Sequence, residues 1–135
     1  MKRVGRMGEV KELGRHLIAE FIGCPASVLD NIEEIKKSLV KAAREAGAQV
    51  CGEVFHKFKP QGVSGIVIIA ESHLSIHTWP EYGYAAIDIF TCGTHVDPWK
   101  AYEILRETFK PRQVSILEFK RGVNIGEGEE ETKRQ

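Results

Sequence analysis

A short central stretch of the sequence concentrates side chains that could do acid, base or nucleophilic chemistry. Residues 71–84 read ESHLSIHTWPEYGY, and a cysteine follows at Cys92. Imidazole is the side chain best suited to acid–base chemistry near neutral pH, and this stretch carries two, His73 and His77. Ser72 and Cys92 are candidate nucleophiles or acids. Because the stretch directly follows the most apolar run of the chain, it is a candidate site at the end of a buried strand.

Residue chemistry alone leaves three interpretations open. The histidines, aromatic residues and cysteine could be structural, as single residues of these types usually are. A metal site would draw on His73, His77, Cys92 and His95. Residues four apart on a straight strand are roughly 13 Å apart, however, which is too far for one ion. A conventional serine or cysteine nucleophile is a third possibility, although the chain has no G-x-S-x-G turn.

A longer run, from Gly62 to Gly93, resembles a known family. It reads GVSGIVIIAESHLSIHTWPEYGYAAIDIFTCG and is similar to the short prokaryotic type of S-adenosylmethionine decarboxylase. The block Glu-Ser-His-Leu-x-Ile-His-Thr-Trp-Pro-Glu is long and specific. The segments GRHLIAEF near the start and VDPWKA after the cysteine also resemble the family. Only the ends of the chain, at about 1–12 and 122–135, fall outside the resemblance.

The resemblance implies a precursor that breaks its own Glu71-Ser72 bond. In such a precursor, the Ser72 hydroxyl attacks the carbonyl carbon of Glu71, and an ester replaces the amide. Loss of the Ser72 Cα proton and hydrolysis then leave a pyruvoyl group where the serine stood. The family pattern assigns stabilisation of the oxyanion to Ser64 and removal of the proton to His77, whose imidazole suits a base near neutral pH.

The resemblance also implies what the processed enzyme does. The pyruvoyl group would form a Schiff base with the α-amine of S-adenosylmethionine and replace pyridoxal phosphate as the electron sink. Cys92 would return a proton to the carbanion that decarboxylation leaves. Substrate binding is assigned to Phe58, stacked on adenine, to Glu81, accepting from the ribose hydroxyls, and to backbone contacts of Leu74. The product would be the aminopropyl donor for polyamine (spermidine) biosynthesis.

Two other functions remain open from the sequence. An enzyme of the same pyruvoyl family could decarboxylate arginine, since the central block does not distinguish the two substrates. A non-catalytic homologue could keep the fold as a binding partner. The presence of every family position argues against a loss of activity; these positions are Ser64, Ser72, His77, Glu81 and Cys92.

The elements that position these residues follow from the apolar pattern. A helix face recurs from Val28 to Ala46, with Ser27 as its N-cap. A second helix begins after Asp97-Pro98 and ends before Pro111. Strands are predicted at 16–24, 49–58, 63–70, 74–79, 84–91 and 114–119. The order β-α-β-β-β-β-α-β predicts an α+β two-layer sandwich, an antiparallel sheet with two helices packed on one face.

Length and composition limit the remaining possibilities. The 135 residues predict a single domain with flexible tails at 1–12 and 122–135, which self-cleavage would divide into a β chain, 1–71, and an α chain, 72–135. Nineteen basic and nineteen acidic residues leave no basic surplus for nucleic acid. No apolar run is long enough for a membrane helix and no signal peptide is evident, which predicts a cytoplasmic protein.

The size of the chain also bears on its assembly. A domain of this length has one core and little room for a deep substrate cavity. This favours a site shared between subunits, and the resemblance likewise implies a homodimer of processed protomers with sites at or near the interface. The odd number of cysteines argues against a disulfide framework. Neither a metal nor pyridoxal phosphate is expected.

Overall fold

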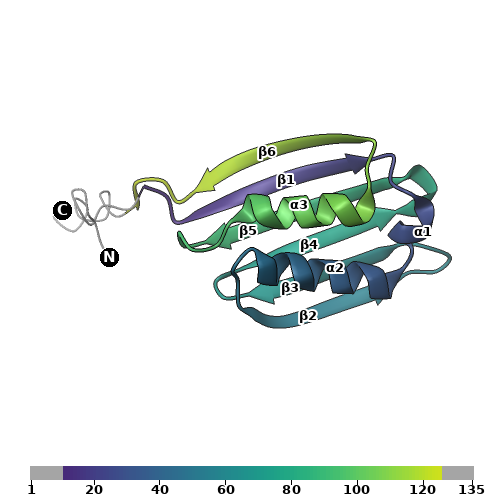
Figure 1. Cartoon of the computed structure of the whole chain (residues 1–135), viewed down its shortest axis with the longest axis horizontal. Coiled ribbons are helices and arrows are strands. Elements are labelled where there is room, and N and C mark those ends of the chain that lie inside the picture. The colour runs from purple at the N-terminus through teal and green to yellow at the C-terminus, as the bar shows by residue number, and fades with distance from the viewer. Residues whose placement is uncertain (1–10, 126–135) are drawn as a thin grey trace.

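Six antiparallel strands form one sheet, and the helices pack on one of its faces (Figure 1). The structure is a computed structural model that describes residues 11–125. The sheet order is β2-β3-β4-β5-β1-β6. The strands are β1 (Gly14–Ile22), β2 (Val50–Lys57), β3 (Val63–Ile69), β4 (Ser72–Trp79), β5 (Tyr84–Cys92) and β6 (Gln113–Arg121). The predicted α+β sandwich is confirmed.

The helical layer contains one more helix than predicted. The single helix expected from Val28 to Ala46 is two helices, α1 (Ala26–Leu29) and α2 (Ile32–Glu45). The chain breaks between them because the Asn31 carboxamide accepts from the backbone N–H of Glu34 and so caps α2. Ser27 lies inside α1 and caps nothing, so that part of the prediction was wrong.

The second long helix, α3 (Pro98–Phe109), begins as predicted. The Asp97 carboxylate accepts from the backbone N–H of Trp99, and Pro98 occupies the first turn, where its missing N–H costs nothing. A short 3-10 helix, η1 (Pro80–Tyr82), joins β4 to β5. Among residues 11–125, no helix has the length and apolarity that crossing a bilayer requires.

Strand alternation separates a core face from an uncovered face of the sheet. On β4, Leu74 and Ile76 are buried beneath the helices, whereas His77 points to the other side. We call this other side the open face, because none of the described helices packs on it (Figure 1). It carries exposed apolar side chains on five of the six strands and beside β2: Ile18, Ile22, Val54, Phe58, Ile68, Trp79, Leu117 and Phe119.

The described ends of the chain run beside each other. The backbone N–H of Leu13 donates to the carbonyl of Arg121, and that of Asn124 donates to the carbonyl of Lys11. Most of the tails expected at 1–12 and 122–135 lie outside the described residues.

Candidate active site

The Glu71-Ser72 bond lies in the tight turn that joins β3 to β4. Ile69 pairs with Ser72 across this turn, so only Ala70 and Glu71 connect the strands. Of these two residues only Glu71 takes positive φ, which is the pattern of a type II turn, whose second central residue requires it. Glu71 accordingly has a φ of 73°, in the left-handed region, where a side chain costs roughly 1–2 kcal/mol. The hairpin thus holds the residue before Ser72 in a conformation that most residues avoid.

The Ser72 hydroxyl is in an unusual environment for a buried polar group. Within residues 11–125, its Oγ is the one buried side-chain nitrogen or oxygen that has no hydrogen-bond partner. Most buried hydroxyls are bonded, and an orphaned one calls for a functional explanation. A hydroxyl without a partner has its lone pairs and proton free for chemistry. This environment fits a serine that is consumed to make a prosthetic group.

Cys92 ends β5 beside the same bond. Its Sγ lies 3.6 Å from the carbonyl oxygen of Glu71, to which the thiol can donate a weak hydrogen bond. Burial raises the pKa of the Cys92 thiol, and the Glu71 carboxylate raises it further. Both effects disfavour the thiolate, so the side chain remains an acid at neutral pH. The site therefore suits Cys92 as a proton donor better than as a nucleophile.

A cavity of about 280 Å³ adjoins these residues. Its walls are the loop after α2, the turn that contains Glu71, the end of β5 at Cys92 and the loop before α3, including His95. The cavity thus brings a thiol, a carboxylate and an imidazole together at one end of the sheet. None of the described residues forms a group of three or more potential metal ligands, there or elsewhere.

Ser64 and His77 form a second pair, on the open face. They are directly opposite each other in the register of β3 and β4. Ser64 Oγ lies 2.7 Å from His77 Nδ1, a hydrogen bond that can pass a proton between hydroxyl and imidazole. Five residues separate His77 from Ser72 along β4, which corresponds to roughly 16 Å. Within one chain, this pair therefore does not reach the Glu71-Ser72 bond.

Two of the three residues expected to bind substrate, Phe58 and Glu81, lie at the opposite end of the sheet from Ser72. Phe58 follows β2, is 45% exposed and packs edge-on against His56, with ring centroids 4.5 Å apart. Glu81 is exposed on η1. The side chain of Leu74, in contrast, is buried in the core between sheet and helices. Its backbone pairs with β3 on one side and with β5 on the other, so the backbone contact expected of Leu74 stays a prediction.

A polar cluster on the part of the open face formed by β5, β1 and β6 was not anticipated from the sequence. His16 Nε2 lies 2.9 Å from Asp88 Oδ1, and Arg121 donates to His16 Nδ1 at 3.0 Å. Because arginine can only donate, His16 Nε2 carries the proton and donates to Asp88. Strand alternation could have placed each residue on this face. Their meeting depends on β1 pairing with both β5 and β6, which local pattern does not reveal.

Comparisons with known proteins agree with this geometry. The family described as S-adenosylmethionine decarboxylase matches residues 15–122. The S-adenosylmethionine decarboxylase proenzymes of Thermosipho africanus and Thermotoga maritima are each 57% identical to the chain over 113 residues, which are 84% of this chain and 87% of each relative. The crystal structure of the adenosylmethionine decarboxylase from Aquifex aeolicus is 33% identical. It aligns with a TM-score of 0.80 over 84% of this chain and 94% of that one. The chain belongs to the S-adenosylmethionine decarboxylase family.

Proposed function

We propose that this chain is the precursor of an enzyme that decarboxylates S-adenosylmethionine, and that it matures by breaking its own Glu71-Ser72 bond. The observation that carries the proposal is the cleavage site itself. A left-handed Glu71 precedes a buried serine hydroxyl without a partner, and the Cys92 thiol lies beside the Glu71 carbonyl. The two products are a β chain, residues 1–71, and an α chain, residues 72–135.

Maturation uses the chain's own side chains. Ser72 Oγ attacks the carbonyl carbon of Glu71, and the acyl group moves from nitrogen to oxygen. Ser64 donates to the oxyanion that forms in this step. His77 removes the Ser72 Cα proton, which expels the Glu71 carboxylate, and hydrolysis releases ammonia and leaves the pyruvoyl end of the α chain. No external cofactor such as pyridoxal phosphate is needed.

Ser64 and His77 perform these roles from a second copy of the chain. The estimated 16 Å between His77 and Ser72 along one strand excludes direct proton transfer within a protomer. A two-fold axis that lies between the two sheets, parallel to them and perpendicular to the strands, would lay the Ser64–His77 region of one open face over the Glu71-Ser72 end of the other. Phe58 and Glu81, which lie still farther from Ser72 along the sheet, would reach the same site from the partner. Each dimer then contains two equivalent sites.

The open face has the composition of a surface that another protein covers. Its exposed apolar side chains occur on most of the strands, including Ile18, Ile68, Leu117 and Phe119. Several exposed apolar side chains on one face of a sheet are typical of an interaction site. A second copy is the favoured occupant because it also supplies the residues that the cleavage site lacks. The functional protein is therefore a homodimer joined through the open faces.

In the processed enzyme, the pyruvoyl group supplies the electron sink for decarboxylation of an α-amino acid. Cys92 holds a proton at the same end of the sheet, and its raised pKa keeps that proton in place at neutral pH. Phe58 stacks on the adenine, where an aromatic face also attracts the sulfonium charge. Glu81 accepts from the ribose hydroxyls. The reaction takes place in the cytoplasm and yields the aminopropyl donor for spermidine synthesis.

The test of substrate is release of labelled CO₂ from the carboxyl group of S-adenosylmethionine by the purified, processed protein. Arginine labelled in the same position is the parallel substrate, since it is the alternative amino acid for this chemistry. We expect release from S-adenosylmethionine and none above background from arginine. Release from arginine alone would refute the proposed substrate. A protein that is never cleaved and releases CO₂ from neither would be the non-catalytic homologue.

A further inference from the structure

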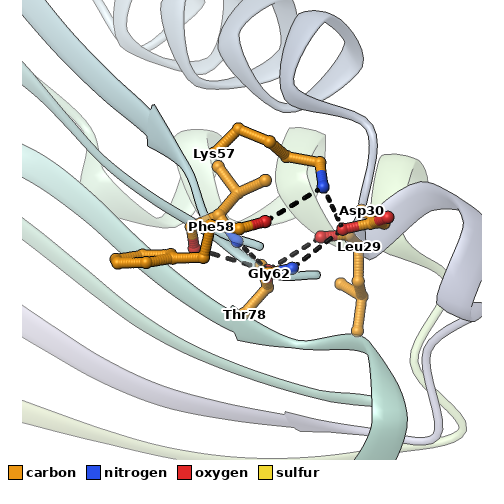
Figure 2. A network of polar contacts seen from close by, with 7 residues as sticks. Leu29, Asp30, Lys57, Phe58, Gly62 and Thr78 are labelled. Atoms are coloured by element: carbon orange, nitrogen blue, oxygen red, sulfur yellow. Dashed lines mark hydrogen bonds and ion pairs between the residues drawn. The ribbon is translucent and has the colours of Figure 1, made fainter. Parts of the chain in front are cut away.

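A polar network ties the turn between β2 and β3 to the helical layer (Figure 2). The Asp30 carboxylate, at the end of α1, accepts from the backbone N–H of Gly62 at 2.8 Å. The same oxygen lies 3.0 Å from Lys57 Nζ. Lys57 Nζ also donates to the carbonyl oxygen of Phe58 at 3.3 Å. One carboxylate therefore holds both sides of this turn, and we call the pair of Asp30 and Lys57 the latch.

The strand that follows the turn is anchored to the same region. Thr78 Oγ1 accepts from the backbone N–H of Val63 at 2.9 Å and lies 2.7 Å from the carbonyl oxygen of Leu29, to which it donates. Leu29 directly precedes Asp30, so the β3 side of the turn is fixed to α1 by a buried hydroxyl as well as by the latch. The latch thus acts on a turn whose β3 side is already held in place.

Lys57 and Phe58 leave the end of β2 in opposite directions. Lys57 reaches toward the helices, whereas the ring of Phe58 points away from them (Figure 2). The ring packs against His56 on the open face. The backbone N–H of Phe58 donates to the Gly62 carbonyl at 2.8 Å, which closes the turn. Contacts on the helical side of the sheet therefore set the backbone from which an open-face aromatic ring projects.

The latch is a charged but partly exposed pair. Hydrogen bonding from Gly62, and then from Lys57, lowers the pKa of Asp30, so its carboxylate is ionised at any physiological pH. The two side chains are 36% and 37% exposed, and pairs at that exposure contribute little to global stability. Removal of the Asp30–Lys57 pair should consequently change the local order of the turn between β2 and β3 far more than the global stability of the fold.

We propose that Asp30 and Lys57 are positioning residues that set affinity for the adenosyl part of the substrate by fixing Phe58. This inference rests on the proposed function, in which Phe58 stacks on adenine. Neither residue touches the reacting atoms, and the adenine is remote from the bond that breaks. Loss of the latch should therefore weaken binding of substrate and transition state alike, which raises KM and leaves kcat unchanged.

The test compares four variants of the full chain. Asp30→Asn and Lys57→Met each remove the ion pair, whereas Lys57→Arg retains its charge and donors. Glu33→Gln is the matched control, because it removes one exposed carboxylate from the neighbouring first turn of α2. We expect KM for S-adenosylmethionine to rise about three- to fivefold in the first two variants, because a partly exposed ion pair cannot change substrate binding by more than it contributes to the order of the turn. In Lys57→Arg and Glu33→Gln, KM should stay within twofold of the unaltered protein.

A second measurement separates this inference from the proposed function. Hydrogen exchange at the amides of Phe58 and Gly62 needs no substrate, and we expect it to accelerate in Asp30→Asn and not in Glu33→Gln. Unchanged exchange in Asp30→Asn would show that there is no latch, whatever the enzyme acts on. Faster exchange with unchanged KM would refute the positioning role. Failure of the unaltered, processed protein to release CO₂ from S-adenosylmethionine would instead refute the proposed function.

Discussion

At the scale of single residues, the candidate site divides into two sets that do not meet within one chain. Glu71, Ser72 and Cys92 gather where β4 begins and β5 ends, beside the cavity. Ser64 and His77 form a hydrogen-bonded pair farther along the sheet. The first set carries the bond to be broken and an acid, and the second carries a base. We therefore expect substitutions in the two sets to have different consequences.

Replacing Cys92 should separate maturation from turnover. Cys92→Ala removes the proposed proton donor and leaves the Ser72 hydroxyl in place, so fragments should still form. Loss of a general acid typically costs on the order of 10²–10⁴-fold in rate, and we expect CO₂ release to fall by about that range. Cys51→Ala, at an exposed thiol on β2, is the control and should leave both fragment formation and CO₂ release unchanged. Full turnover in Cys92→Ala would rule out the donor role.

The acidity of Cys92 gives a prediction on pH. Burial and the Glu71 carboxylate raise the pKa of the Cys92 thiol, and only the thiolate reacts with iodoacetamide. In an uncleaved Ser72→Ala precursor, alkylation of Cys92 should therefore reach half its maximal rate at a higher pH than in an unfolded peptide around the same residue. Peptide mass spectrometry follows the modification. A midpoint below that of the peptide would contradict the environment described.

At the scale of elements, the β3–β4 hairpin matters most for the candidate site, because its turn contains the Glu71-Ser72 bond. The sequence predicts strands on both sides of the cleavage site, but it predicts the second one from Leu74. The strand begins at Ser72, because Ser72 pairs with Ile69 and leaves a turn of only two residues. Glu71 is an unusual residue for positive φ, so turn chemistry offered no signal of this. The break between α1 and α2 was not predicted either. The apolar positions keep their helical spacing across residue 31, and the start of a new helix is marked only by the hydrogen bond from the Glu34 N–H to the Asn31 side chain.

The conformation of Glu71 predicts the effect of a glycine. Glu71→Gly removes the cost of a side chain at a φ of 73°, and in a Ser72→Ala background it should raise the free energy of unfolding by about 1 kcal/mol. Ala70→Gly is the matched control in the same turn. It should lower that free energy by about 0.5–1 kcal/mol, because it only adds freedom to the unfolded chain. Unfolding in urea measures the free energy of unfolding of each variant. A loss of stability in Glu71→Gly would show that Glu71 is not under backbone strain.

At the scale of the whole molecule, the proposed dimer through the open faces would bring together two sets of site residues that do not meet within one chain. The α+β sandwich and the layer that holds the core could be predicted from hydrophobic periodicity and element order. Distances between site residues could not, because they depend on strand register and on which face each side chain takes. Ser64 and His77 meet through the β3–β4 register, whereas the extended length of β4 separates His77 from Ser72. The dimer was expected from size and family resemblance, and the separation of the two sets now gives it a chemical reason.

Shared sites predict complementation between inactive chains. Ser72→Ala lacks the nucleophile and His77→Ala lacks the base, so neither should be cleaved when produced alone. When the two chains are produced together, a mixed dimer places the intact His77 of one over the intact Ser72 of the other. We expect the His77→Ala chain to be cleaved in the mixture and the Ser72→Ala chain to stay whole. Absence of any cleavage in mixed dimers would refute a site built from two chains.

The central claim is that the Glu71-Ser72 bond breaks without help from another protein. Intact mass spectrometry of the purified chain tests it most directly, with Ser72→Ala as the uncleaved reference. The 15.2 kDa chain should resolve into fragments of about 8 and 7 kDa, the first ending at Glu71. The second should be lighter by one ammonia than a fragment that begins with serine, as conversion to a pyruvoyl group requires. A single uncleaved mass after prolonged incubation, or a second fragment that begins with intact serine, would contradict the account.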